Sequence, residues 1–427
     1  GNTTGGQPFE VITAGAGEIT LNGGAQALAG IFDSDGNFGG KMIISNAGTK
    51  TFAEATGGAN RFGTITTDAA ATAVFGSTSA TTTLANSGTT TLTGAASVNT
   101  INNAGALTVT STVDGVAGGG ADTTINLTAT DASVLFNGTT ALAYDMVIAA
   151  GTDGFGTINF IDSADNAAAT NTTAGGDIGA NTLKVGTINI GSATKAGNLT
   201  TIAGDLIFAS AINVTGGNVT AEASALDIAA SIGDADDLVA IVLDDNAGNA
   251  MLDIGATASI FGTIDGSATA GAGTSRIDAN AATTFEGNIG ENNAVEELEI
   301  GAASNLKGAV VTATATNFDA DVALSIGGAV AQTIDTVFTF DTLEEGTINV
   351  SNTAGLVTFK GQIGTTAARA KEIVIADDAD ATFEAAIFAN TLDINTAAAD
   401  DIITFTTGGH IIGDAGATAD AVQIAGG

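Results

Sequence analysis

The sequence contains no cysteine, no tryptophan, one tyrosine, one histidine and one proline among its 427 residues. Without cysteine, neither a disulfide nor a thiolate metal site can stabilise the fold, so stability must come from packing and backbone hydrogen bonds. The single histidine, His410, has no second histidine with which to form a zinc site, and we expect it to be structural. Groups for nucleophilic or acid–base catalysis are too scarce, and we predict no catalytic residues and no enzyme activity.

Basic residues are scarce as well. Lys and Arg together number 10 against 46 Asp and Glu, which gives a net charge of −36. This excess of negative charge repels phosphate backbones and anionic lipid surfaces, so nucleic-acid binding and attachment to membranes through basic patches are excluded as main roles. No run approaches 18 uninterrupted apolar residues, which predicts no transmembrane helix and no direct membrane insertion of this segment.

The composition is nevertheless that of a folded chain. Apolar residues make up 44% and charged residues only 13%, whereas disordered chains are poor in apolar residues and dense in charge. Thr, Val and Ile alternate in short segments, as expected for strands, because β-branched side chains suit a pleated surface. Gly and Asn separate these segments and accept the positive φ angles of turns. We predict an all-β fold with almost no helix.

Two short motifs recur along the chain, and such repeats indicate a repetitive architecture. Asn-x-Gly turns at Asn46, Asn86 and Asn103 are followed by alternating apolar and Thr positions, which predicts a turn, a short strand and another turn. The tripeptide Gly-Thr-Ile begins at Gly63, Gly156, Gly186, Gly262 and Gly346.

A longer repeat sets the length of the structural unit. The segments that begin at Phe285 and Phe359 share the form Phe-x-Gly-x-Ile-Gly. The steps from Phe261 to Phe285 to Leu306, and from Phe359 to Phe383 to Phe405, are 24, 21, 24 and 22 residues. This length is typical of one coil of a β-solenoid and is about half that of a propeller blade.

We therefore predict an elongated β-solenoid, a parallel β-helix with coils of about 20–24 residues. It would occupy residues 1–427 as a single continuous domain, because no linker or change in composition divides the chain. An array of β-sandwiches is the second choice of fold.

One segment has the pattern of a calcium loop. Asp33, Ser34, Asp35 and Asn37 place oxygen side chains around Gly36, as at the start of an EF-hand loop. The twelfth position of the loop holds an isoleucine instead of the bidentate glutamate, so a plain Asx turn explains the pattern equally well. Asp33, Asp35 and Asn37 are the candidate metal ligands, and Ca²⁺ is the expected cofactor.

The acidic residues gather in clusters, at 234–237, 244–245, 296–299 and 377–380. We expect these clusters at turns or on outward faces of coils, where they form a solvated rim that keeps the protein soluble. Where acidic positions of successive coils stack about 4.8 Å apart, their carboxylates repel unless a cation bridges them.

Two other functions fit parts of the sequence. A β-helix polysaccharide-active enzyme would use paired carboxylates, but the chain has only Tyr144 and phenylalanines as aromatic platforms for sugars. Two close carboxylates beside a basic residue in a groove would favour it. Threonine runs at 81–83, 89–91 and 108–110 would suit a face that matches ice or another ordered surface, although they are irregular along the chain and Thr is also an ordinary strand residue.

The turn-and-strand segments 86–94 and 103–111 resemble coils of bacterial autotransporter and haemagglutinin-type passengers. The segments that begin at Phe285 and Phe359 are similar to repeats in the passenger of rickettsial outer-membrane protein B and related surface-layer-like proteins. The resemblance implies a secreted, surface-displayed β-helix that serves as a coat, an adhesin or a fibre subunit.

These observations together predict a structural protein of a bacterial cell surface, the subunit of an extracellular layer or filament. Its partners would be copies of itself, because strand edges at the ends of a solenoid template the addition of another subunit. An adhesin that binds a host or neighbouring cell is the alternative, and it would need an exposed apolar patch near a tip.

Overall fold

A computed structural model of the chain is all-β, and its parallel sheets form a β-solenoid of about 15 turns. It describes residues 11–13, 17–34, 38–57, 60–115, 123–137, 147–161, 172–174, 176–195, 197–204, 206–219, 223–268, 271–396, 402–406, 411–413 and 422–426. None of these residues is helical, as predicted. The chain divides into two compact units, Gly1–Ile212 (unit 1) and Asn213–Gly427 (unit 2). The prediction of a single domain over residues 1–427 stays a prediction.

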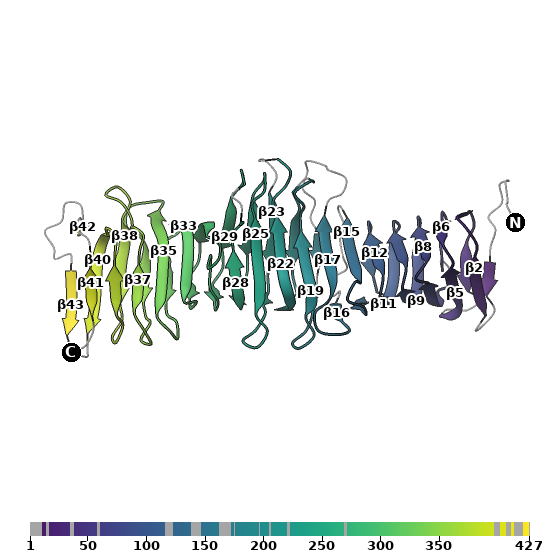
Figure 1. Cartoon of the computed structure of the whole chain (residues 1–427), viewed down its shortest axis with the longest axis horizontal. Helices are drawn as coiled ribbons and strands as arrows, with labels where there is room; N and C mark the ends of the chain where they lie inside the picture. Colours follow the sequence, from purple (N-terminus) through teal and green to yellow (C-terminus); the bar gives the residue numbers. More distant parts are fainter. Residues whose placement is uncertain are drawn as a thin grey trace. The chain divides into compact units, whose positions relative to one another are not determined.

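In unit 1, successive turns contribute strands to two parallel sheets, and neighbouring turns lie side by side (Figure 1). The first sheet contains β3 (Gln26–Leu28), β6 (Gly48–Phe52), β8 (Ala71–Phe75), β10 (Thr89–Leu92), β12 (Ala106–Val109), β15 (Ser133–Asn137), β17 (Phe155–Ile161) and β19 (Val185–Ile190). The second sheet contains β2 (Glu18–Asn22), β5 (Gly39–Ser45), β7 (Phe62–Thr67), β9 (Ser79–Asn86), β11 (Ala96–Asn103), β14 (Thr124–Leu127) and β16 (Val147–Ala150).

Shorter strands complete unit 1. Three parallel pairs are β1 (Val11–Thr13) with β4 (Phe32–Ser34), β13 (Val113–Asp114) with β11, and β18 (Thr172–Ala174) with β20 (Leu199–Ile202). The remaining strands are β21 (Leu206–Ile207) and β22 (Ala209–Thr215), which lies where the two units divide.

Unit 2 has the same organisation. Its first sheet contains β23 (Ser224–Ile228), β26 (Ala250–Ile254), β29 (Ser275–Ala279), β31 (Val295–Ile300), β33 (Val310–Phe318), β35 (Gln332–Phe340), β37 (Val357–Phe359), β39 (Ala381–Phe383) and β41 (Ile403–Phe405). Its second sheet contains β24 (Ser231–Ile232), β27 (Ala258–Ile260), β30 (Thr283–Phe285), β32 (Ser304–Leu306), β34 (Ala323–Ile326), β36 (Glu345–Val350), β38 (Ala370–Ile375), β40 (Phe388–Thr396) and β42 (Ile411–Ile412). Two further parallel pairs are β25 (Val239–Asp244) with β28 (Gly262–Asp265), and β43 (Val422–Gly426) with β40.

The core consists of ladders of like residues. Phe52 stacks on Phe75 with ring centroids 4.8 Å apart, and Phe383 lies between Phe359 at 4.9 Å and Phe405 at 5.5 Å. Alternation along each strand sends every second side chain inward, and parallel pairing places each inward residue over its counterpart in the next turn. The predicted steps from Phe359 to Phe383 to Phe405 are therefore confirmed by the register of β37, β39 and β41.

The predicted register at Phe261 is wrong by one residue. Ile260 pairs with Phe285, and Phe285 pairs with Leu306. Phe261 is only half-buried, because it lies between β27 and β28, where the chain turns through Gly262 with φ +129°. The Phe that precedes Gly-Thr-Ile here is a corner residue and does not belong to the core ladder.

The length of a turn also varies more than predicted. Leu92 pairs with Val109, a step of 109 − 92 = 17 residues, whereas Phe155 pairs with Val185, a step of 185 − 155 = 30 residues. The strands stay in register while the connections between them differ in length, since loops tolerate insertions far better than a packed ladder does.

Glycine of the Gly-Thr-Ile motif makes room for the preceding turn. Gly156 and Gly346 have φ angles of +78° and +68°. A Cβ atom at Gly346 would lie 2.4 Å from the Phe318 ring, and one at Gly156 would lie 2.5 Å from the Leu127 side chain. Only glycine fits there, because both the backbone angle and the approach of a buried neighbour exclude a side chain.

We expect Phe383→Ala to lower the free energy of unfolding by about 3–5 kcal/mol, since it leaves a cavity between two stacked rings. Phe405→Ala is the matched control: Phe405 is 41% exposed, and its loss should be clearly smaller. Urea unfolding followed by circular dichroism measures both, and equal losses would contradict the ladder.

Candidate functional site

A row of acidic residues crosses the outward face of the first sheet of unit 2. Asp227, Asp253, Asp278 and Glu299 pair in register on β23, β26, β29 and β31. Their neighbours along each strand face the core, so strand alternation points the four carboxylates outward. Adjacent members are one strand apart, about 4.8 Å, and their charges would repel. We call this row the acidic ladder.

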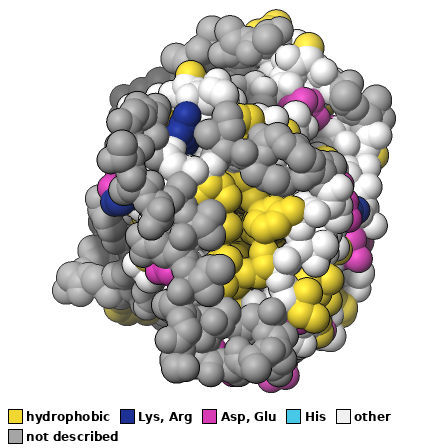
Figure 2. All heavy atoms as spheres, turned by 90° about the vertical axis from the view of Figure 1, so that its left-hand side faces the viewer, with side chains coloured by type: hydrophobic (Ala, Val, Ile, Leu, Met, Phe, Trp, Pro, Cys, Tyr) yellow, Lys and Arg dark blue, Asp and Glu magenta, His cyan; other side chains and the backbone are white. Residues whose placement is uncertain are grey.

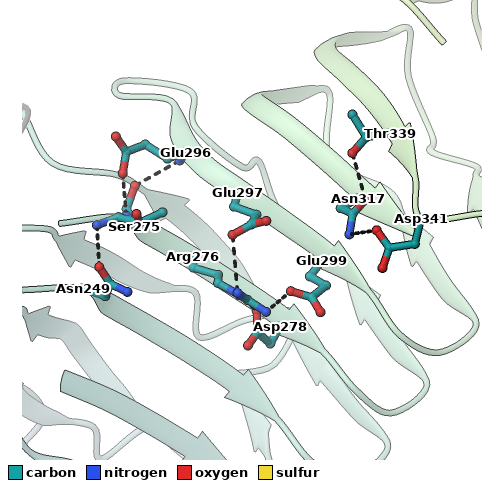
Figure 3. A network of polar contacts seen from close by, with 11 residues as sticks. Asn249, Ser275, Arg276, Asp278, Glu296, Glu297, Glu299, Asn317, Thr339 and Asp341 are labelled. Carbon is teal, nitrogen blue, oxygen red and sulfur yellow. Dashed lines mark hydrogen bonds and ion pairs between the residues drawn. The ribbon is translucent and has the colours of Figure 1, made fainter. Parts of the chain in front are cut away.

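Arg276, two residues before Asp278 on β29, lies beside the end of this ladder that Asp278 and Glu299 form (Figure 3). Its Nε donates to Asp278 and its Nη2 donates to Glu299, while its Nη1 lies 3.5 Å from Oε2 of Glu297 (Figure 3). The side chains of Asp278 and Glu299 are only 8% and 10% exposed. An arginine of the protein itself therefore bridges the stacked carboxylates, the role that the sequence suggested for a bound cation.

Burial raises the pKa of the Asp278 carboxyl above its ordinary value, and repulsion from Asp253 and Glu297 adds to this, against the opposing effects of Arg276. Burial lowers the pKa of the Arg276 guanidinium, but its hydrogen bond to Asp278 and the charges of Asp278, Glu297 and Asp319 outweigh burial and leave that pKa raised. Arg276 therefore stays charged, whereas burial makes the charged form of Asp278 less favourable than it is in water.

Other aspartates bind the backbone of the following turn. In each case a carboxylate oxygen accepts a hydrogen bond from an N–H group 22 to 31 residues further along the chain. Six such bonds, each named with the accepting aspartate first and the residue that donates its N–H second, are Asp33 and Asn60 (2.8 Å), Asp153 and Lys184 (3.0 Å), Asp177 and Leu206 (3.0 Å), Asp245 and Gly271 (3.0 Å), Asp265 and Asn292 (2.9 Å), and Asp380 and Ile402 (2.7 Å).

These six aspartates, which we call the corner aspartates, bind backbone N–H groups for a common physical reason. Where the chain leaves a sheet, the ladder ends and backbone N–H groups lose their carbonyl partners. A carboxylate one turn away replaces the missing acceptor with a charge-assisted bond. Asp245 and Asp265 are 2% and 8% exposed. Of the residues predicted to form a solvated acidic rim, Asp237, Asp245 and Glu299 are buried, so that prediction is wrong for these three.

The predicted calcium ligands are only partly described. Asp33 lies in β4, is 3% exposed, and accepts hydrogen bonds from the backbone N–H groups of Ser34 and Asn60. Asp35 and Asn37 lie outside the described residues, as do Tyr144 and His410. Among the residues that the structure describes, no three acidic or histidine side chains group around a common metal position. Calcium binding stays a prediction.

Sequence reasoning missed a fully buried lysine. The Lys50 ammonium is 0% exposed and donates to the carbonyl oxygens of Gly23 at 2.6 Å and Ser45 at 3.1 Å. The signal was present in the sequence, because Lys50 has the same strand parity as the buried Phe52. The carbonyl groups of two turns thus hold the positive charge without a carboxylate.

Asp278 and Glu299 also meet part of the criterion for a polysaccharide-active enzyme, since two neighbouring carboxylates lie beside a basic residue. The raised pKa of Asp278 would suit a general acid. Arg276, however, donates hydrogen bonds to both carboxylates and holds them in an ion-paired cluster, which is a poor arrangement for transferring a proton to a substrate.

Comparison of the chain with protein-family models, curated proteins and solved structures gives no match. No helix of the length and apolar character needed to cross a membrane occurs in the described part of the chain. The proposals below rest on the residues and on their geometry.

Asp265→Ala should lower the free energy of unfolding by about 1–3 kcal/mol, because it removes the charge-assisted hydrogen bonds that the Asp265 carboxylate, which is 8% exposed, accepts from the backbone N–H and the side-chain amide of Asn292. Asp265→Asn keeps an acceptor oxygen and should lose less. Asp335→Ala, at an exposed position on β35, is the control and should change stability by less than about 0.5 kcal/mol. Equal losses in the free energy of unfolding for all three variants, measured by urea unfolding, would refute a stabilising role for the Asp265 carboxylate.

Asp278 makes a specific contribution to pH dependence. Because its pKa is raised in the fold, the folded protein binds a proton more readily than the unfolded chain, and stability falls as pH rises from about 3.9 through the raised value. Asp278→Asn should remove this contribution, so that the variant gains stability relative to the parent protein as pH rises through that window. Unfolding free energies measured at intervals between about pH 3.5 and 7 test this, and parallel curves for the two proteins would contradict it.

Proposed function

We propose that this protein is a structural component of a bacterial cell surface, the self-assembling subunit of an extracellular layer or filament. The observation that supports the proposal is that carboxylates of the described residues are engaged in contacts within the fold. Carboxylates that could serve catalysis are bound to backbone N–H groups or to Arg276, where they support the ladder. A protein built in this way offers extended, regular faces instead of a reactive centre.

Charge sets the conditions for assembly. Copies with a net charge of −36 repel one another, so salt or bridging cations must lower that repulsion before acidic faces can approach. Asp227 and Asp253, at the end of the acidic ladder away from Arg276, are the natural positions for bridging between copies. Calcium at Asp33, Asp35 and Asn37 would act within a copy.

An adhesin is the second candidate, supported by apolar residues at the C-terminal end of unit 2. Figure 2 shows hydrophobic side chains gathered at the centre of this end. Ile402 and Phe405 are 60% and 41% exposed. Exposed apolar patches mark sites of protein interaction, and a patch at one end would suit attachment to a host or neighbouring cell.

The purified protein should form sheets or filaments visible by negative-stain electron microscopy, and assembly should increase with NaCl concentration. A chelator should reduce assembly at low salt if divalent cations bridge the acidic faces. Indifference to both salt and chelator would remove the cation contribution. A protein that stays monomeric in sedimentation velocity at all salt and calcium concentrations would refute self-assembly, and saturable binding of that monomer to cells would favour the adhesin.

A further inference from the structure

The first sheet of unit 1 has an unusual outward face, which we call the threonine face. Two rows of side chains cross strands β6 to β19 in strict register, and every member is at least partly exposed. The first row is Thr49, Thr72, Thr89, Ala106, Ser133, Thr157 and Thr187. The second row is Thr51, Val74, Thr91, Thr108, Leu135, Asn159 and Asn189. Of the threonine runs in the sequence, residues 89–91 contribute Thr89 and Thr91 to these rows, and residues 108–110 contribute Thr108.

No charged residue lies on the threonine face. Lys50 is the only charged residue in the seven strands, and it points inward and is 0% exposed. The outward face of the first sheet of unit 2, in contrast, carries the acidic ladder and Arg276. The outward face of the second sheet of unit 1 is neutral only from β7 to β16, because Glu18 lies on β2 and Lys41 on β5, so the seven-strand face of the first sheet is the wider neutral surface of this unit.

The geometry of the face is suited to a second sheet. Its residues repeat at the strand spacing of about 4.8 Å, and at several steps identical side chains lie above one another, as in the dry interfaces between paired sheets. Asn189 donates to Asn159 at 2.9 Å, so the rows are held in place before any partner arrives. A face with the same spacing can pack against these rows without rearrangement, which lowers the entropic cost of association.

Charge identifies the partner. Wherever two acidic faces of this protein meet, carboxylates lie opposite carboxylates and repel. Two threonine faces can approach to the usual sheet-to-sheet distance of about 10 Å without such a contact. We propose that the threonine face of unit 1 packs against the same face of a second copy, in a two-fold symmetric contact. A two-fold contact closes after two copies, so it joins copies in pairs, and a second contact between pairs would complete the layer or filament. This inference rests on the proposed function and specifies the surface that joins each pair.

The first test adds a charge to the proposed contact. Thr91→Glu introduces two facing carboxylates into a symmetric contact, and it should raise the concentration needed for assembly by at least about tenfold. The matched control is Thr100→Glu, which makes the same substitution on the second sheet of unit 1, where Thr100 lies in the outward row between Thr83 and Thr124. The control should shift assembly by less than about twofold. Circular dichroism and urea unfolding check that both variants are folded.

The second test uses the absence of native cysteine, which makes a single introduced thiol a clean probe. The thiol of a Thr89→Cys variant should react with a maleimide at least about tenfold more slowly in the assembled protein than in the dilute protein. The thiol of Thr100→Cys should react equally fast in both. This readout depends on where the copies touch and not on how strongly they associate.

The outcomes separate the two proposals. If the parent protein never assembles, the proposed function fails, and shaping of ice crystals by the monomer would assign the threonine face to ordered water. If the parent protein assembles but Thr91→Glu and Thr100→Glu act alike, or the Thr89→Cys thiol stays reactive, the layer or filament stands and this contact is overturned.

Discussion

The parallel ladder is the constraint on which the rest of this structure depends. Each turn is held to the next by backbone hydrogen bonds at the strand spacing, so every side chain meets the residue at the same register position one turn away. Inside, this rule favours like on like, and stacked rings such as Phe359 and Phe383 satisfy it at 4.9 Å. Gly346 shows how strict it is, because the ring of Phe318 occupies the place of its missing side chain.

The same register destabilises a chain with many acidic residues, because it places carboxylates one strand apart just as it places aromatic rings one strand apart. The protein handles its carboxylates in two ways. Arg276 bridges Asp278 and Glu299 within the acidic ladder. Corner residues such as Asp265 turn their charge to the backbone N–H groups of the next turn, where the ladder can no longer supply an acceptor. Part of the acidic composition is therefore structural, and the acidic charge that remains exposed limits which surfaces of two copies can meet.

Both units thus present faces whose chemistry is set by register. The first sheet of unit 2 carries a row of acidic residues, and the first sheet of unit 1 carries neutral rows that include Thr and Asn. The proposed surface layer would use faces of this kind, because lateral contacts between long, regular surfaces join subunits without a cofactor or a reactive group. The buried ammonium of Lys50 fits the same logic, since it turns the only charge of these neutral strands into the interior.

The sequence by itself determined the strand content and the solenoid, because alternation with a period of two and repeats of just over twenty residues survive any variation in the loops. It also determined which way Lys50 points, since strand parity is local. Only the tertiary structure decided the register, as the pairing of Ile260 instead of Phe261 with Phe285 shows. Only the tertiary structure shows that Arg276 bridges carboxylates of the acidic ladder, and that the Asp245 carboxylate accepts a hydrogen bond from the N–H of Gly271. The reason is that the turns differ in length, from 17 to 30 residues, so residues in contact are not separated by a constant number of positions in the sequence. Contacts between turns therefore depend on the length of each connection, and the periodicity of the strands does not give that length.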